Sequence, residues 1–122
     1  MDKVKLTIPK KSEYISTIRL TSSALSNINS FNVDDIEDIK VIVSEICIFF
    51  INNIKENEKP FEVEYIIDND KFKVKVTDLN KGKVNKKNEI KDEMCILIIE
   101  SLSDKYELDL DYNKISFEKY MN

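Results

Sequence analysis

Apolar and polar residues alternate in five stretches of the chain, and each stretch is expected to form a β-strand with one buried and one solvated face. Pro9 ends the first stretch, and Asn69 and Asp70 form a turn between the second and the third. Glu alternates on one of these two strands and Lys on the other, so opposite charges are expected to face each other on the solvated side. The five stretches are residues 3–9, 61–67, 71–76, 106–111 and 114–120.

Three other segments carry apolar residues at helical spacing. Ser12 is a good N-cap for the first helix, which should fade near residues 29–32. The second runs from Val33–Asp35 to about Ile54 and is apolar on nearly every side, so it should lie at the centre or be covered by a partner. Residues 89–105 have an apolar centre that a strand could also carry, but their length and charged flanks favour a third helix.

The expected order is therefore β-α-α-β-β-α-β-β. Strict alternation in the strands means that helices cover only one face of the sheet. The sequence predicts an α+β protein, a two-layer α/β sandwich whose sheet is mixed but largely antiparallel. With 122 residues and 42% hydrophobic content, we expect a single domain over residues 1–122 with one core.

Charge and hydropathy narrow the classes of partner. The net charge is −4 and the pI about 5.0, which argues against direct binding to nucleic acid. The longest apolar runs, residues 46–51 and 94–99, are too short to span a membrane. Residues 1–11 are charged and do not resemble a signal peptide, so we expect a cytoplasmic protein without membrane contact.

The chain has no histidine, which removes His-based acid–base catalysis and His metal ligands. Its two cysteines, Cys47 and Cys95, lie far apart inside apolar runs. We expect both to be reduced core thiols, and we expect neither a disulfide nor a metal site.

The stretch IEDIKVIVSEIC (36–47) resembles the second helix of the anti-sigma factor/serine-protein kinases of Gram-positive bacteria. These proteins belong to the superfamily of histidine kinase-like ATPases. The resemblance covers essentially the whole chain and implies the histidine-kinase-like ATPase fold. Its other parts are LTIPKKSEYISTIRLTSSAL near the start, VTD at 76–78, CILIIESLSDK in the third helix and ISFEKYMN at the end.

The resemblance also implies roles for single residues. The family helix reads E-x-x-x-N, in which the Glu helps to activate the attacking hydroxyl and the Asn holds Mg²⁺. Glu45 stands at the first position, as a vestigial general base, whereas Phe49 replaces the metal ligand. Asp78 stands where the family's Asp contacts the adenine amino group.

Further departures fall on the same nucleotide site. Asn80 replaces the Gly of the family's D-x-G, and Glu93-Met94-Cys95 replaces a Gly-x-Gly whose backbone approaches the phosphates. The family's ATP lid is shortened to a lysine-rich loop at about 79–92. We expect Phe49 and Met94 to fill part of the old pocket. No cofactor is therefore expected, and ATP and Mg²⁺ would be needed only by an active kinase.

Several of these residues also have purely structural readings. Glu45 is either a retained base or a leftover carboxylate satisfied by water or by Lys81 or Lys83. Asp78 either keeps a vestigial adenine contact or simply ends a strand. The run 81–87 is either a solvated loop or a loop that binds phosphate or acidic groups.

Arg19 is the only arginine among 19 basic residues. The resemblance implies a partner-binding role, because the corresponding family residue helps to dock a sigma factor or an anti-anti-sigma protein. The planar guanidinium suits bidentate capture of a carboxylate better than a lysine does. The alternative is an ordinary surface residue on an amphipathic helix.

Two functions of different classes follow. The first is an anti-sigma-factor-like regulator that acts by protein–protein binding, with a sigma factor or an anti-anti-sigma protein as partner and a homodimer as a further option. The second is a divergent ATP-dependent serine-protein kinase acting on an anti-anti-sigma factor. The missing glycines of the phosphate loop favour the first. A structural homodimer subunit without a sigma partner is a third reading.

Overall fold

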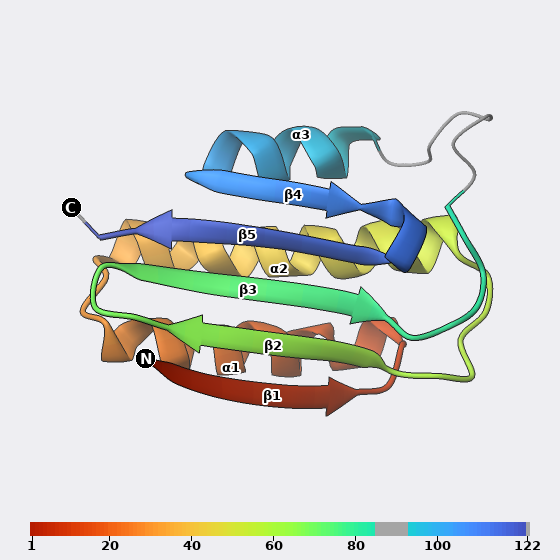
Figure 1. Ribbon diagram of the computed structural model, residues 1–122, viewed down its shortest axis with the longest axis horizontal. Helices are drawn as coiled ribbons and strands as arrows, with labels where there is room; N and C mark the ends of the chain where they lie inside the picture. The colour runs from red at the N-terminus through yellow and green to blue at the C-terminus, as the bar shows by residue number, and fades with distance from the viewer. Residues whose placement is uncertain (85–92, 122) are drawn as a thin grey trace.

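The computed structural model describes residues 1–84 and 93–121. Strands and helices in these residues follow the predicted order β-α-α-β-β-α-β-β (Figure 1). Two short 3₁₀ turns, η1 (Ser12–Tyr14) and η2 (Leu110–Tyr112), interrupt the connections. The main elements are β1 (Asp2–Ile8), α1 (Ile15–Ile28), α2 (Val33–Asn53), β2 (Phe61–Ile67), β3 (Lys71–Asp78), α3 (Glu93–Leu102), β4 (Lys105–Asp109) and β5 (Lys114–Tyr120).

The five strands form one sheet in the order β1-β2-β3-β5-β4. All four neighbouring pairs are antiparallel, so the prediction of a mixed sheet is wrong for the described strands. β5 pairs with β3 on one side and with β4 on the other. β3 and β4 run in the same direction, but β5 lies between them and no parallel pair forms.

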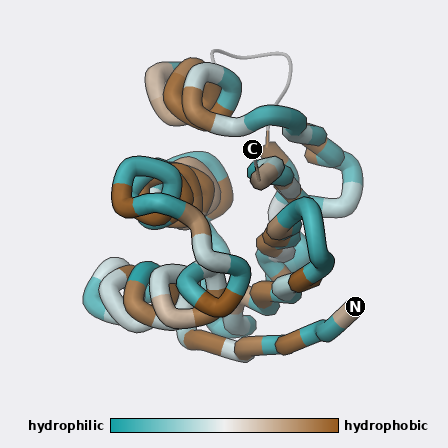
Figure 2. Tube along the Cα trace, turned by 90° about the vertical axis from the view of Figure 1, so that its left-hand side faces the viewer, coloured by the Kyte–Doolittle hydropathy of each residue, from teal (hydrophilic) through white to brown (hydrophobic). Residues whose placement is uncertain are grey.

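The helices form a second layer on one face of the sheet, as predicted. Figure 2 looks along the strands and shows the helices on one side and the sheet on the other. On β2, residues alternate between buried and partly exposed; the buried Tyr65 contacts Ser22 on α1, and the buried Phe61 contacts Phe50 on α2. α2 is the central helix, with seven buried side chains: Ile39, Ile42, Val43, Ile46, Cys47, Phe49 and Phe50. This burial explains why α2 is apolar on nearly every side.

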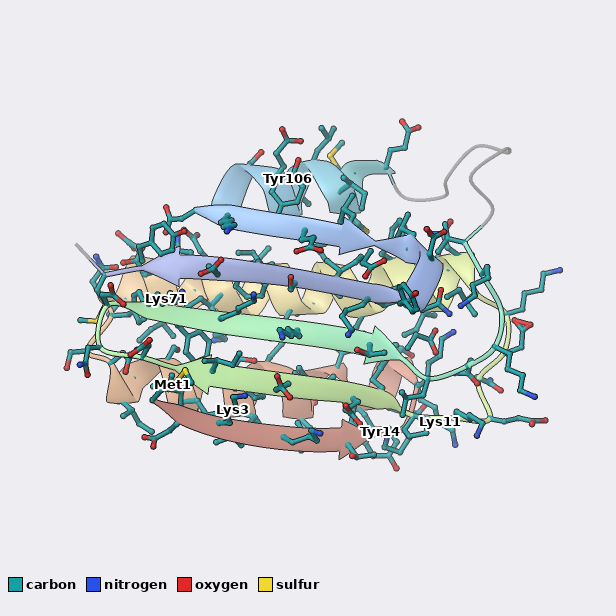
Figure 3. All side chains as sticks on the ribbon, viewed as in Figure 1. Met1, Lys3, Lys11, Tyr14, Lys71 and Tyr106 are labelled. Carbon is teal, nitrogen blue, oxygen red and sulfur yellow. The ribbon has the colours of Figure 1, made fainter. Side chains whose placement is uncertain are left out.

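The other face of the sheet is open and charged; it is turned toward the viewer in Figure 3, where Lys3 of β1 and Lys71 of β3 are labelled. Lys75 lies opposite Glu64 in the β2–β3 pairing, with 3.8 Å between the charged atoms. Lys71 Nζ lies 3.3 Å from Glu118 Oε1 on β5. The predicted pairing of opposite charges across the β2–β3 hairpin is confirmed by Lys75 and Glu64, although such a partly exposed pair contributes little stability.

The start of α1 differs from the prediction, whereas the start of α2 agrees with it. Ser12 is not the N-cap of α1, because it opens the turn η1, in which Tyr14 N donates to Lys11 O at 3.1 Å. α1 begins only at Ile15 and has no side-chain cap. α2 begins at Val33 as expected and is capped by Asn32, whose Oδ1 accepts from Asp35 N at 2.8 Å.

The C-terminal elements are shorter than predicted. The expected helix start at residue 89 lies outside the described residues, and the helix ends at Leu102 because β4 already begins at Lys105. β4 ends at Asp109, where η2 leads to Asn113 with a left-handed φ of 52°. Asn tolerates this conformation, so the predicted turn at Tyr112-Asn113 is confirmed.

In the described part of the chain, no helix has both the length and the apolar character needed to cross a bilayer.

Candidate functional site

Phe49 occupies the position of the expected metal ligand and is a core residue. Its side chain on α2 has 0% exposure, and its ring lies edge-on to that of Phe50, with 5.7 Å between centroids. The helix therefore offers a hydrocarbon ring one turn after Glu45 instead of an oxygen or nitrogen ligand. The expectation that Phe49 belongs to the core is confirmed.

Glu45 lies on α2 and is partly exposed. Among the residues that the structure describes, its carboxylate has no recorded hydrogen bond or ion pair, and neither Lys81 nor Lys83 pairs with it. Its role as a vestigial base stays a prediction.

Asp78 ends β3, and its carboxylate is enclosed by the protein. The Asp78 side chain is 0% exposed and lies 2.7 Å (Oδ2 to Nζ) from Lys10, whose side chain is 2% exposed. Asp78 Oδ2 accepts no recorded hydrogen bond. Within the described residues, its negative charge is therefore balanced by the positive charge of Lys10. The fold thus buries an ion pair at the residue for which the resemblance implies a vestigial adenine contact.

Lys10 has two further partners. Its Nζ donates to the carbonyl of Ile54 at 2.7 Å and to that of Glu56 at 2.8 Å. Ile54 is the C-cap of α2, where unpaired carbonyls favour a cation. Sequence reasoning missed Lys10, because lysines are almost never fully buried. The position two residues after β1 is the only local signal, and it is not specific.

Asn80 completes the surroundings of Asp78. Asp78 Oδ1 accepts from the Asn80 backbone N at 3.0 Å and from its side-chain Nδ2 at 2.7 Å. The same amide bonds both backbone groups of Lys59, at 2.9 and 2.8 Å. The side chain that replaces the family's glycine therefore fixes the turn after β3 to the segment before β2.

Asn113, the C-cap of η2 directly before β5, extends this polar network. Its Nδ2 donates to the carbonyl of Asn80 at 3.1 Å and to that of Gly82 at 2.6 Å, and its own carbonyl accepts from Asp78 N at 2.9 Å. Its Oδ1 is buried without a hydrogen-bond partner among the described residues. No sequence motif indicated this role.

Met94 corrects a prediction, because it does not fill the old pocket. It is 65% exposed, on the side of α3 away from the buried Cys95 and Ile99. Glu93 is also exposed. The part of the expected lid at residues 85–92 lies outside the described residues.

Arg19 lies on α1 beside the buried Ile18 and is itself exposed. Within residues 1–84 and 93–121, no ion pair of its guanidinium is recorded. Its neighbour Leu20 is also largely exposed. The exposed guanidinium group of Arg19 beside the exposed Leu20 side chain is compatible with docking of a protein partner, but nothing in the fold identifies that partner.

At the positions where the resemblance implies nucleotide contacts, the described side chains do not fit a magnesium–nucleotide complex. Phe49 has no ligand atom, and both oxygens of Asp78 are occupied from within the chain. Among the described residues, no group of three His, Cys, Asp or Glu side chains is placed to hold a metal ion.

Comparison with known proteins agrees with the architecture. The family model described as "Histidine kinase-like ATPase domain" matches residues 8–119. Three similar proteins are named serine-protein kinase RsbW. The protein of Halalkalibacterium halodurans is 32% identical over 62% of this chain and 46% of its own length. Those of Bacillus cereus (strain AH187) and Listeria monocytogenes (serotype 4a) are 33% and 38% identical over 63% of this chain and 49% and 50% of their lengths.

The chain thus spans about half the length of the curated relatives it matches. The family model covers nearly all of the chain, including all five strands of the sheet in whole or in part and the three helices. The chain belongs to the histidine kinase-like ATPase domain family.

Proposed function

We propose that this protein is an anti-sigma-factor-like regulator that acts by binding a protein partner and not by phosphorylating it. The partner is a sigma factor or an anti-anti-sigma protein. Its similarity to proteins named serine-protein kinase supports descent from that group. The observation that carries the proposal is the burial of Phe49 at the position of the metal ligand. The proposal places the protein in the cytoplasm and includes a homodimer.

Phosphoryl transfer depends on positioning and on neutralising the charge of the phosphates, mostly through a metal ion. Glu45 is the one catalytic candidate that keeps a partly exposed carboxylate. A carboxylate without a metal ligand one turn away cannot assemble that chemistry by itself. Enclosure of Asp78 by Lys10 removes the second candidate contact.

Nucleotide binding is the direct test of this proposal. We expect calorimetric titration with ATP, with and without Mg²⁺, to show a dissociation constant weaker than about 1 mM, because no metal ligand follows Glu45. A serine-protein kinase RsbW from one of the similar species serves as the positive control. Micromolar affinity, or transfer of labelled phosphate to a co-purified partner, would instead support the divergent kinase.

Partner docking through Arg19 is the second part of the proposal. The side chain is exposed on α1, and no carboxylate of the described residues is recorded as its ion-pair partner. A bidentate pair with a partner carboxylate would combine charge with fixed geometry. Leu20 next to it would add apolar contact area.

Arg19→Ala is therefore expected to weaken partner binding by roughly 30-fold, which corresponds to about 2 kcal/mol. The partner is first captured from native cytosol and identified by mass spectrometry, and the affinity is then measured with purified proteins. Circular dichroism should be unchanged, because Arg19 is exposed.

Lys5→Ala is the matched control, because it removes one positive charge from the opposite, open face of the sheet. It should leave the affinity within about twofold. Equal affinities for Arg19→Ala and the unmodified chain would rule out the docking role of Arg19. Capture of proteins unrelated to sigma regulation would count against the proposed partner.

A further inference from the structure

We propose that Asp78 and the carbonyls of Ile54 and Glu56 form a binding site for a primary ammonium group, and that the chain's own Lys10 occupies this site in place of a ligand. The inference goes beyond the proposed function, since it concerns what the pocket binds and not which partner the protein docks.

The match between donor and acceptors supports this assignment. A lysine ammonium has three N–H donors and no acceptor. Here Nζ donates hydrogen bonds to two carbonyl oxygens, Ile54 O at 2.7 Å and Glu56 O at 2.8 Å, and lies 2.7 Å from Asp78 Oδ2 as its ion-pair partner. Asp78 Oδ2 has no hydrogen bond of its own, so removal of Lys10 would leave a buried carboxylate oxygen uncompensated. Such a group strongly favours a replacement cation.

The three oxygens come from separate parts of the fold. Asp78 ends β3, Ile54 is the C-cap of α2, and Glu56 belongs to the segment that leads to β2. Lys10 itself follows β1. The Lys10 ammonium therefore connects the C-terminal ends of β1, β3 and α2, as a bound ligand would.

A surface hollow of about 380 Å³ lies beside this site. Its lining includes Glu56, which supplies one of the carbonyls, and Asn80, which bonds Asp78. Neither Lys10 nor Asp78 lines this hollow, so rescue of Lys10→Ala requires that removal of the lysine stem open a path from the hollow to the carboxylate. While Lys10 is in place, the amino group of an incoming ligand has no access to Asp78 Oδ2.

Chemical rescue tests the assignment. Lys10→Ala removes the three carbons and the nitrogen that n-propylammonium would supply. We expect its melting temperature to fall by roughly 10–25 °C, because one partner of a buried ion pair is lost. Addition of n-propylammonium chloride at 100 mM should restore several degrees by mass action. The same salt should leave the unmodified chain unchanged.

Three controls separate the site from general effects of salt and solvent. Lys11→Ala removes the neighbouring exposed lysine, labelled in Figure 3, and should neither lower the melting temperature strongly nor respond to the amine. Tetramethylammonium lacks N–H donors and 1-propanol lacks charge, so neither should rescue Lys10→Ala. Equal rescue by tetramethylammonium, or a melting temperature of Lys10→Ala equal to that of the unmodified chain, would overturn the assignment.

A double-mutant cycle covers the case in which Lys10→Ala does not fold. Lys10→Met and Asp78→Asn are each expected to lower the melting temperature, and the double variant should lose less than the sum of the two. Additive losses would show that the two side chains are not coupled and would defeat the proposal.

Adenosine distinguishes this proposal from the proposed function. Adenosine binding by the unmodified chain that disappears in Asp78→Asn would show that Asp78 is accessible, and the internal-ligand assignment would fail. ATP·Mg²⁺ binding that persists in Asp78→Asn would contradict the proposed function and would leave the ammonium site intact.

Discussion

Phe49→Asn is expected to destabilise the protein by about 3–5 kcal/mol and not to create a magnesium site. The Phe49 ring is fully buried and packs edge-on against Phe50. Asparagine would leave a cavity and would place an amide in apolar surroundings, where an unpaired polar group adds its own desolvation cost. Restoring the family's residue type therefore removes a core contact without rebuilding the rest of the site. Urea denaturation measures the loss, and calorimetry with Mg²⁺ and ATP measures any gain in binding.

Two matched variants separate the cost of the lost packing from the cost of burying an amide. Phe49→Leu keeps the site apolar and should cost only about 1–2 kcal/mol. Leu20→Asn makes a comparable change on the exposed face of α1 and should stay within about 0.5 kcal/mol. If Phe49→Asn is as stable as the unmodified chain and binds ATP only with Mg²⁺, the position is a silent metal site and the assignment of Phe49 to the core is wrong.

Much of the fold could be predicted because alternation reports directly which side of a strand is buried. On β2 and β3 the apolar positions coincide with the buried positions except at two residues: Ile66 is only partly buried, and the charged Asp78 is buried. The same reasoning placed α2 at the centre, since a helix without a polar face needs cover on several sides. Pairing partners depend on where the connections lead, and for that reason the position of β5 between β3 and β4 was not foreseen.

The polar network around Asp78 could not be predicted, because each of its contacts joins residues far apart in the sequence. The helices α1 and α2 and the strands β2 and β3 lie between Lys10 and Asp78 along the chain, and Asn113, between η2 and β5, reaches Gly82. A lysine after a strand and an asparagine in a turn have ordinary surface readings. Only the fold shows that these side chains meet at one end of the sheet.

The prediction for Met94 failed for a related reason. The resemblance placed it at the phosphate loop, and its apolar character then indicated a filler for an emptied pocket. Successive residues of a helix are turned by about 100° from each other, so a difference of one residue decides whether a side chain points inward. In the structure, α3 presents Cys95 and Ile99 to the core and turns Met94 to solvent.

Stability is expected to fall steeply at alkaline pH because two acidic groups are buried in their neutral forms. Burial raises the pKa of the Cys47 thiol from 9.0 to about 12. Burial also raises the pKa of Tyr65 from 10.0 to about 12; a hydrogen bond with Ser22 opposes this shift, and the charge of Cys47 adds to it. The Tyr65 hydroxyl lies 2.8 Å from Ser22 Oγ and shares a hydrogen bond with it.

The sign follows from proton binding. Between pH 9 and pH 12 the unfolded chain releases these protons, whereas the folded chain keeps them. Their contribution to stability is therefore complete below pH 9 and is lost as the pH rises to about 12. A tenfold difference in acid dissociation constant corresponds to about 1.4 kcal/mol, so the two shifts together bound the loss at roughly 7 kcal/mol.

Urea denaturation at a series of pH values, with the free energy of unfolding plotted against pH, measures this effect. Cys47→Ala should flatten the curve from pH 9 upward and Tyr65→Phe from pH 10 upward, because each removes one of the two groups. Tyr112→Phe is the matched control, since this ring is 72% exposed and its hydroxyl is solvated in both states. If Cys47→Ala and Tyr65→Phe lose stability with pH as steeply as the unmodified chain does, the alkaline transition originates in other groups, and burial of these two neutral acids is not its cause.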